Sequence, residues 1–119
     1  MRQRPYEKLI AWKEADDLCV WIYQLTKKFP PDEKFSLTQQ LRRAAYSVPT
    51  NIAEGNARRS PNDKAHFFEI AISSLEEVHY QCKLSYRFKY ITLEQLGQAD
   101  DKIQRTGYLI MKLRSSVLK

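Results

Sequence analysis

The sequence predicts an all-α protein of one domain, residues 1–119, folded as an antiparallel up-down-up-down four-helix bundle. Apolar residues recur every three or four positions along most of the chain, as they do on one face of a helix. Only three glycines interrupt the sequence, and the alternation of β-branched residues that is typical of strands is missing. The segments between the helical patterns are short, and short connections make successive helices antiparallel.

The first helical pattern ends at Phe29, because Pro30 cannot continue a helix and restricts the residue before it. Its apolar residues share one helical face: Ala11, Ala15, Leu18, Ile22, Leu25 and Phe29. Ser36 and Gln39 then have the spacing of a capping box. The second stripe contains Leu37, Leu41, Ala44, Val48 and Ile52. Pro49 removes one backbone hydrogen bond, and we expect a kink there because the stripe keeps its phase across it.

The third and fourth helical patterns each follow a start signal. Ser60 precedes Pro61, which places a capping serine before a proline at the first helical position. Thr92 and Gln95 form a second capping box. The third stripe contains Phe68, Ile72, Leu75, His79, Cys82 and Tyr86. The fourth has the seven-residue spacing of a bundle seam, with Leu96, Ile103, Ile110 and Val117, and Ala99 and Leu113 between them.

The chain has more apolar residues than one bundle core needs. They make up 43% of the sequence, or about 51 residues, whereas four helical faces need about 24 to 40. Several aromatic residues lie off the stripes: Trp12, Trp21, Tyr23, Tyr46, Phe67, Tyr80 and Tyr108. Scattered surface aromatics are common, but aromatics are also enriched at subunit interfaces. We therefore expect a homo-oligomer.

Composition narrows the environment and the partners. No run of 18 apolar residues is present, so no membrane span is predicted, and the N-terminus lacks the apolar stretch of a secretory signal. A cytoplasmic location is therefore expected. Cys19 and Cys82 are too few for a disulfide framework, and they are interpreted as small core residues. The net charge of +6 favours polyanionic partners.

Little in the sequence points to catalysis. Glu76 and His79 have the spacing of a helical metal-binding pair, but the only other histidine is His66, on the same predicted helix. No nucleophile and base grouping follows from two histidines, and no glycine-rich phosphate loop is present. We predict a protein that is not an enzyme, with no metal and no cofactor. His79 is interpreted as a partly buried histidine with a local partner, and Glu76 as a salt-bridge residue.

A polar stripe on the second predicted helix has two interpretations. Its members recur at spacings of three and four: Arg43, Ser47, Asn51, Glu54 and Arg58. They form either a solvated helix face with weak pairs or a buried or interfacial network that sets the register between helices or subunits. Asparagine and serine are poor choices inside a helix unless their side chains have fixed partners.

Basic residues near the ends of the second predicted helix, and others near the C-terminus, are candidates for phosphate contacts. The candidate nucleic-acid-binding residues are Arg42, Arg43, Arg58, Arg59, Lys112 and Arg114. Arg58 and Arg59 are the strongest candidates, because they precede a helix start whose free amides favour anions. Alternatively, about half of the basic residues pair with the 14 acidic residues.

Several segments resemble one family, the four-helix bundle proteins encoded in 23S ribosomal RNA intervening sequences. The central block runs from Gln40 to Gly55 and includes Gln40-Leu-Arg-Arg-Ala-Ala45, Ser47-Val-Pro49 and Asn51-Ile-Ala-Glu-Gly55. Tyr6-Glu-Lys-Leu9, Trp12, Arg58, Ser60, Ile70-Ala71, Ser74-Leu-Glu76 and Tyr90-Ile91 extend the likeness over nearly the whole chain. Ser36, Ser73 and Lys89 depart from it, since relatives often carry glycine there.

The resemblance implies a ring-like homopentamer associated with the ribosomal RNA locus. A related bundle, the accessory subunit of diversity-generating retroelements, binds nucleic acid and a reverse transcriptase. Our first hypothesis is therefore a non-enzymatic oligomer that binds RNA through its basic surface. The alternative is a scaffold or adaptor for a protein partner, such as a polymerase or reverse transcriptase. No sequence-specific readout is predicted, because no groove-reading or base-stacking module is recognisable.

Overall fold

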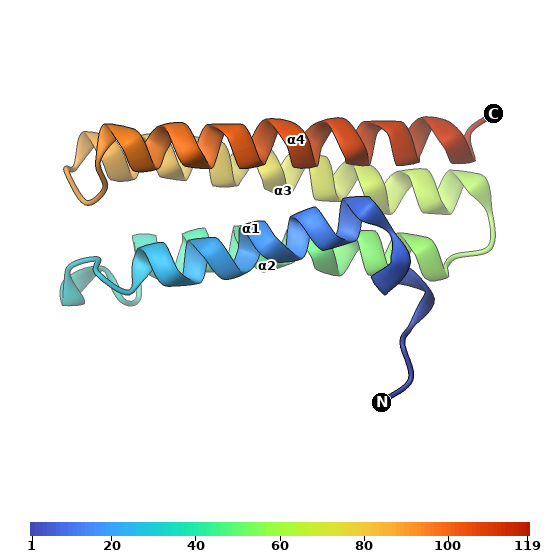
Figure 1. The fold of residues 1–119 in the computed structure, drawn as a ribbon, viewed down its shortest axis with the longest axis horizontal. Coiled ribbons are helices and arrows are strands. Elements are labelled where there is room, and N and C mark those ends of the chain that lie inside the picture. Colours follow the sequence, from blue (N-terminus) through green and yellow to red (C-terminus); the bar gives the residue numbers. More distant parts are fainter.

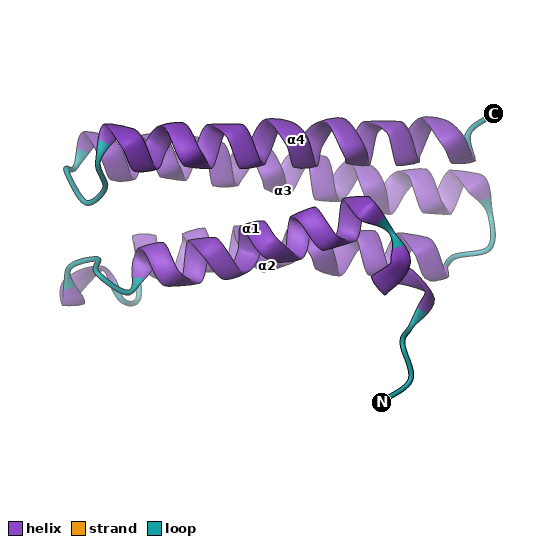
Figure 2. Cartoon of the chain, in the orientation of Figure 1, coloured by secondary structure: helices purple, strands orange, loops and turns teal.

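The computed structural model describes residues 1–119 and contains four α-helices and no strand, which confirms the all-α prediction. The helices are α1 (Ile10–Thr26), α2 (Leu37–Ala57), α3 (Pro61–Arg87) and α4 (Leu93–Val117), with short 3-10 helices η1 (Pro5–Lys8) and η2 (Pro31–Glu33). Figure 1 shows them packed along the long axis of the molecule, each running opposite to the one before it. Only short connections join them (Figure 2).

The core lies between all four helices. Each helix packs against two neighbours, because α1 contacts α4 as well as α2. The predicted face of α1 is buried, with Leu25 only partly covered. The helix ends at Thr26 rather than at Phe29, because Lys27 and Phe29 donate their backbone N–H groups to carbonyls three residues back and so form tight turns. Phe29 remains buried after the helix has ended.

The buried face of α3 differs from the predicted stripe. Phe68, Leu75 and Cys82 are buried as expected, but Ile72 and His79 are only partly covered and Tyr86 is exposed. Small residues take their place in the core: Ala65, Ala71, Ser74, Val78 and Ser85. Because α3 packs against both α2 and α4, its buried face is wider than a single stripe and includes residues that periodicity assigned to the surface.

Two of the three predicted helix starts have the expected side-chain caps. The hydroxyl of Ser60 accepts the backbone N–H of Asp63 at 3.0 Å, and Thr92 and Gln95 form both bonds of a capping box. The capping box at Ser36 is wrong, because its side chain makes no cap hydrogen bond. A carboxylate oxygen of Glu33, at the end of η2, accepts the Leu37 N–H at 3.3 Å instead.

Helix α2 continues without interruption through Pro49, and the predicted kink there stays a prediction. Gly55 lies inside the last turns of the helix, where α2 and α3 approach closely. A Cβ atom at this position would lie 2.7 Å from Cε1 of Phe68 and 3.0 Å from Cβ of Phe67. The side chain of any other residue would therefore separate the two helices just before the chain turns into α3. No helix has the length and apolar character that crossing a membrane requires.

Candidate functional site

The positive charge of the chain is concentrated at one end of the bundle. Figure 1 shows the N-terminal segment, the α2–α3 connection and the C-terminus towards the same end. We call this the basic end and define it by residues 1–12, 54–70 and 107–119. It holds nine basic and four acidic residues, a net charge of +5 out of the total of +6. The other two thirds of the chain are nearly neutral, with eleven basic and ten acidic residues.

The α2–α3 connection at the basic end is short and well anchored. Lys64 donates from Nζ to the carbonyl oxygen of Asn56 at 2.9 Å, and Ser60 caps the start of α3. Arg58 and Arg59 lie exposed between these two anchors. The guanidinium of Arg58 lies 4.5 Å from the centre of the Phe67 ring. Neither arginine forms an ion pair or side-chain hydrogen bond, so both remain available to an anion.

The two candidates on α4 are less available than the arginines of the α2–α3 connection. Arg114 donates from Nε to Glu69 at 2.9 Å, which offsets its charge locally. This pair is partly exposed, and such pairs contribute at most about 1 kcal/mol. Lys112 has no acidic partner, but its ammonium lies 5.5 Å from the centre of the Tyr108 ring.

Arg42 and Arg43 are neighbours with different environments. Arg42 reaches across to α1, where its Nε donates to Oγ1 of Thr26 at 2.8 Å and its Nη2 donates to the Tyr23 carbonyl oxygen at 3.3 Å. Its guanidinium also lies 4.7 Å from the centre of the Tyr23 ring. Arg42 therefore joins α2 to the end of α1. Arg43 is exposed and forms no ion pair or side-chain hydrogen bond.

The polar stripe of α2 divides into two parts. Ser47 and Asn51 have fixed partners: the Ser47 hydroxyl lies 2.8 Å from that of buried Ser74 on α3, and Asn51 donates to the carbonyl and hydroxyl oxygens of Ser47 at 2.8 and 3.0 Å. The Ser47–Ser74 bond links α2 to α3, and the two bonds of Asn51 lie within α2 and hold Ser47 in place. Arg43 and Glu54 are exposed and lie outside this network. The network interpretation thus describes the centre of the polar stripe. The two ends of the stripe are exposed on the surface of the single chain.

The candidate metal pair has a different environment from a metal site. His79 Nε2 lies 3.2 Å from Oδ1 of Asp100 on α4. Asp100 is therefore the local partner that the sequence analysis expected for this histidine. Glu76 is exposed and forms no salt bridge, contrary to its interpretation as a salt-bridge residue. No group of three or more His, Cys, Asp and Glu side chains is arranged to hold a metal ion.

Both cysteines are free thiols in surroundings that disfavour the thiolate. Burial, and to a smaller extent the charge of Asp100, raises the pKa of Cys82 to about 12. Partial burial, with a smaller contribution from Asp16, also raises the pKa of Cys19. Because the thiolate is the reactive form, neither residue has the character of a nucleophile at neutral pH.

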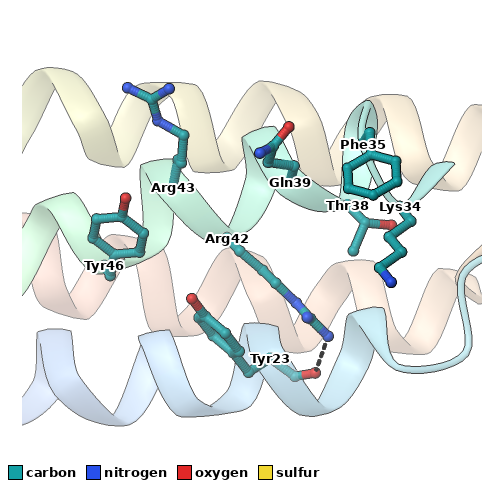
Figure 3. Close-up of a pocket in the computed structure, with 8 residues that line it drawn as sticks. All are labelled: Tyr23, Lys34, Phe35, Thr38, Gln39, Arg42, Arg43 and Tyr46. Atoms are coloured by element: carbon teal, nitrogen blue, oxygen red, sulfur yellow. Dashed lines mark hydrogen bonds between the residues drawn. The ribbon is translucent and has the colours of Figure 1, made fainter.

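An open groove of about 480 Å³ lies at the opposite end of the bundle from the basic end. Figure 3 shows the residues that line it: Tyr23, Lys34, Phe35, Thr38, Gln39, Arg42, Arg43 and Tyr46. The sequence did not indicate this groove, because its walls come from α1, from the α1–α2 connection and from two turns of α2. Only the pairing of Arg42 and Arg43 marked its position in the sequence.

The comparisons with known proteins give a family from one match and a fold from another. The family model of the 23S rRNA-intervening sequence protein matches residues 7–112. The chain is also similar to a solved structure from Bacteroides thetaiotaomicron, a protein of unknown function from the S23 ribosomal protein family. That similarity has a TM-score of 0.82 at 24% identity and covers 89% of this chain and 96% of the other. None of the curated proteins matches the chain.

Proposed function

The chain belongs to the 23S rRNA-intervening sequence protein family, and from this premise we propose that it is a non-enzymatic homo-oligomer that binds RNA through its basic end. The observation that carries the proposal is the concentration of net charge +5 in the basic end. Phosphate neutralisation by lysine and arginine supplies most of the sequence-independent affinity for nucleic acids. Arg58 and Arg59 are the central residues of this surface, because both are exposed and neither has an acidic partner.

The absence of catalysis is part of the proposal. The two thiols have raised pKa values, and His79 is paired with Asp100 on a partly exposed surface. Binding by charge and shape requires none of these groups. Homo-oligomerisation is supported by large apolar side chains that the single chain leaves exposed, among them Tyr80, Tyr108 and Met111. A larger assembly would repeat the basic end in every subunit and so strengthen its field at low salt.

The RNA-binding proposal is tested by a salt series with the Arg58→Ala/Arg59→Ala double variant. Each lost phosphate contact is expected to lower the slope of log affinity against log salt by about 1, so the double variant loses about 2. The ligands are a fragment of ribosomal RNA and an unrelated RNA of equal length. Filter binding or fluorescence anisotropy measures the affinity.

The matched control is Lys83→Ala/Arg87→Ala, which removes two exposed basic residues outside the basic end. It is expected to leave the slope almost unchanged. An equal loss in both double variants would show that overall charge, rather than the basic end, governs binding. If the unaltered protein binds no RNA at low salt, the RNA proposal is wrong. Light scattering across a concentration series tests the oligomer, and a constant monomer mass would contradict it.

The second candidate function is a scaffold for a protein partner, and the same exposed apolar side chains favour it. Tyr108 and Met111 line a shallow groove between α3 and α4 together with Ile72. A partner held there would be retained by the Arg58→Ala/Arg59→Ala variant, in which RNA binding is expected to be weakened. Capture of one defined protein by this variant, and its loss on Tyr108→Ala, would favour the scaffold over the RNA-binding function.

A further inference from the structure

The groove at the end of the bundle opposite the basic end combines cations and aromatic rings without any carboxylate. Of its eight lining residues, three are cationic and three are aromatic, and none is acidic. We call it the α2 groove, with the lining residues given above. Its charge is complementary to an anion. Its volume of about 480 Å³ lies in the usual range for small-ligand sites.

Two of the aromatic residues are largely exposed, and the ammonium of Lys34, another lining residue, lies 5.4 Å from the centre of the Phe35 ring. The Phe35 residue is 78% exposed and Tyr46 is 47% exposed. The third ring, Tyr23, already faces the Arg42 guanidinium at 4.7 Å. Exposed aromatic rings beside a cationic groove are the two components of surfaces that bind single-stranded nucleic acids, because bases stack on the rings while cations follow the phosphates.

The cations of the groove are arranged for phosphate contacts. Arg42 uses two of its five N–H donors on Thr26 and Tyr23, which fixes the guanidinium and leaves three donors for a ligand. A fixed guanidinium loses less entropy on binding than a mobile one. Arg43, directly beside it, has no partner within the chain and is free to follow a phosphate.

The spacing of the rings decides between a single nucleotide and a strand. Phe35 lies just before the start of α2, and Tyr46 lies nine residues after Leu37, which corresponds to roughly 14 Å along the helix axis. A stacked base lies about 4.5 Å from a ring centroid, so two rings that stack on both faces of one base lie about 9 Å apart. The wider spacing of Phe35 and Tyr46 along the helix is too large for that arrangement. They suit two different bases of an extended strand.

We propose that the α2 groove binds single-stranded RNA, with separate bases stacked on Phe35 and Tyr46 and the intervening phosphates at Arg42 and Arg43. This inference rests on the proposed RNA-binding function and adds a second contact at the far end of the bundle. Double-stranded RNA does not fit this site, because its bases are stacked inside the helix and cannot stack on Phe35 and Tyr46. The groove therefore selects unpaired segments, whereas the basic end contacts phosphates of either form.

The test compares oligouridylate with a perfect RNA duplex of the same strand length, using Phe35→Ala and Tyr46→Ala. Loss of one stacked base is expected to weaken oligouridylate binding at least about fivefold in each variant, with duplex binding unchanged. Phe35→Trp, which keeps a stacking ring, is expected to retain binding. Tyr80→Ala is the matched control, because this exposed tyrosine lies outside the groove.

A second measurement reports stacking directly. A fluorescent adenine analogue within the oligonucleotide is expected to be quenched on binding, with less quenching in Phe35→Ala. Uridine monophosphate is expected to compete weakly, because it occupies one ring only. Strong competition by the mononucleotide would contradict the two-base site and overturn the proposal of a strand.

The two proposals fail in different ways. If duplex and oligouridylate both bind, and neither groove variant weakens oligouridylate more than Tyr80→Ala does, the α2 groove is not the site and the basic end is untouched. If the unaltered protein binds neither RNA at low salt, the proposed function fails and this site with it. Selective loss of oligouridylate binding in both groove variants supports the inference.

Discussion

The two ends of the bundle present opposite kinds of surface. The basic end has a net charge of +5, exposed arginines in a short connection, and two chain termini. The rest of the chain is nearly balanced in charge, and the opposite end holds the α2 groove and connections that are held by side-chain hydrogen bonds. If both proposals hold, one protein contacts a polyanion in two ways. A field of charges acts at a distance and with little selectivity, whereas a lined groove selects by shape and stacking.

The geometry of the basic end depends on Gly55, and a substitution at this position is expected to have the largest effect on the difference between the two ends. Gly55→Ala places a Cβ atom 2.7 Å from Cε1 of Phe68, a buried ring. Overpacking of this kind costs typically about 1–3 kcal/mol. Urea unfolding followed by circular dichroism is expected to show a destabilisation of about 2 kcal/mol, together with weaker RNA binding by Arg58 and Arg59.

Gly97→Ala is the control for this substitution, because a Cβ atom there would have no atom within 4 Å other than those of the adjacent residues and the backbone of its own helix. Alanine is favoured over glycine inside a helix by about 0.5–1 kcal/mol, so this variant is expected to be stabilised. The two changes are chemically identical and should have opposite signs. A destabilisation of equal size in both would contradict the close approach of α2 and α3.

The α2 groove depends on Arg42, and the adjacent Arg43 provides a matched control. Arg42→Ala removes the bonds to Thr26 and Tyr23, and loss of charge-assisted hydrogen bonds at a partly buried site is expected to cost about 1–2 kcal/mol. Arg43→Ala removes an exposed side chain without partners, and its cost is expected to stay within about 0.5 kcal/mol. Thermal and urea unfolding measure both. Equal destabilisation by the two variants would show that the hydrogen bonds of Arg42 do not stabilise the fold.

The smallest expected effect on stability concerns the hydrogen bond between Tyr90 and Glu33, which precedes the α2 groove residues Lys34 and Phe35 in the sequence. The Tyr90 hydroxyl donates to Glu33 Oε2 at 2.7 Å. This bond, and then the Leu37 N–H, holds the pKa of Glu33 below its usual value of 4.5. The bond to Glu33 raises the pKa of Tyr90 to about 12.

The sign of each shift gives a pH window for this hydrogen bond. The lowered pKa of Glu33 contributes stability that is complete above 4.5 and is lost as the pH falls through the folded value. The raised pKa of Tyr90 contributes stability that is complete below 10.0 and is lost as the pH rises through about 12. We expect the stability difference between the unaltered protein and Tyr90→Phe to be largest between these limits. A difference that does not change with pH would contradict this hydrogen bond.

Much of the fold followed from local sequence patterns. The periodicity of apolar residues located all four helices, and the side-chain caps at Ser60 and Thr92 formed as predicted. Such patterns succeed because helix hydrogen bonds and caps join residues only three or four positions apart. The failed cap was decided by a contact between residues distant in sequence. Ser36 had the right spacing for a capping box, but Glu33 took the Leu37 N–H instead, since Tyr90, distant in sequence, holds that carboxylate in place.

The candidate site was predicted less well than the fold. Sequence alone determined the helical class and the basic character, and it marked the two arginine pairs as candidates. Only the tertiary structure decided that Arg114 pairs with an acidic residue, and that the guanidinium of Arg42 is held in place by neutral oxygens of α1. It also left Arg43, Arg58 and Arg59 exposed without an ion pair or side-chain hydrogen bond. It also placed the charge at one end and built the α2 groove at the other. The physical reason is that a side chain's partner depends on which distant helix packs beside it, and periodicity along one helix does not specify its neighbours.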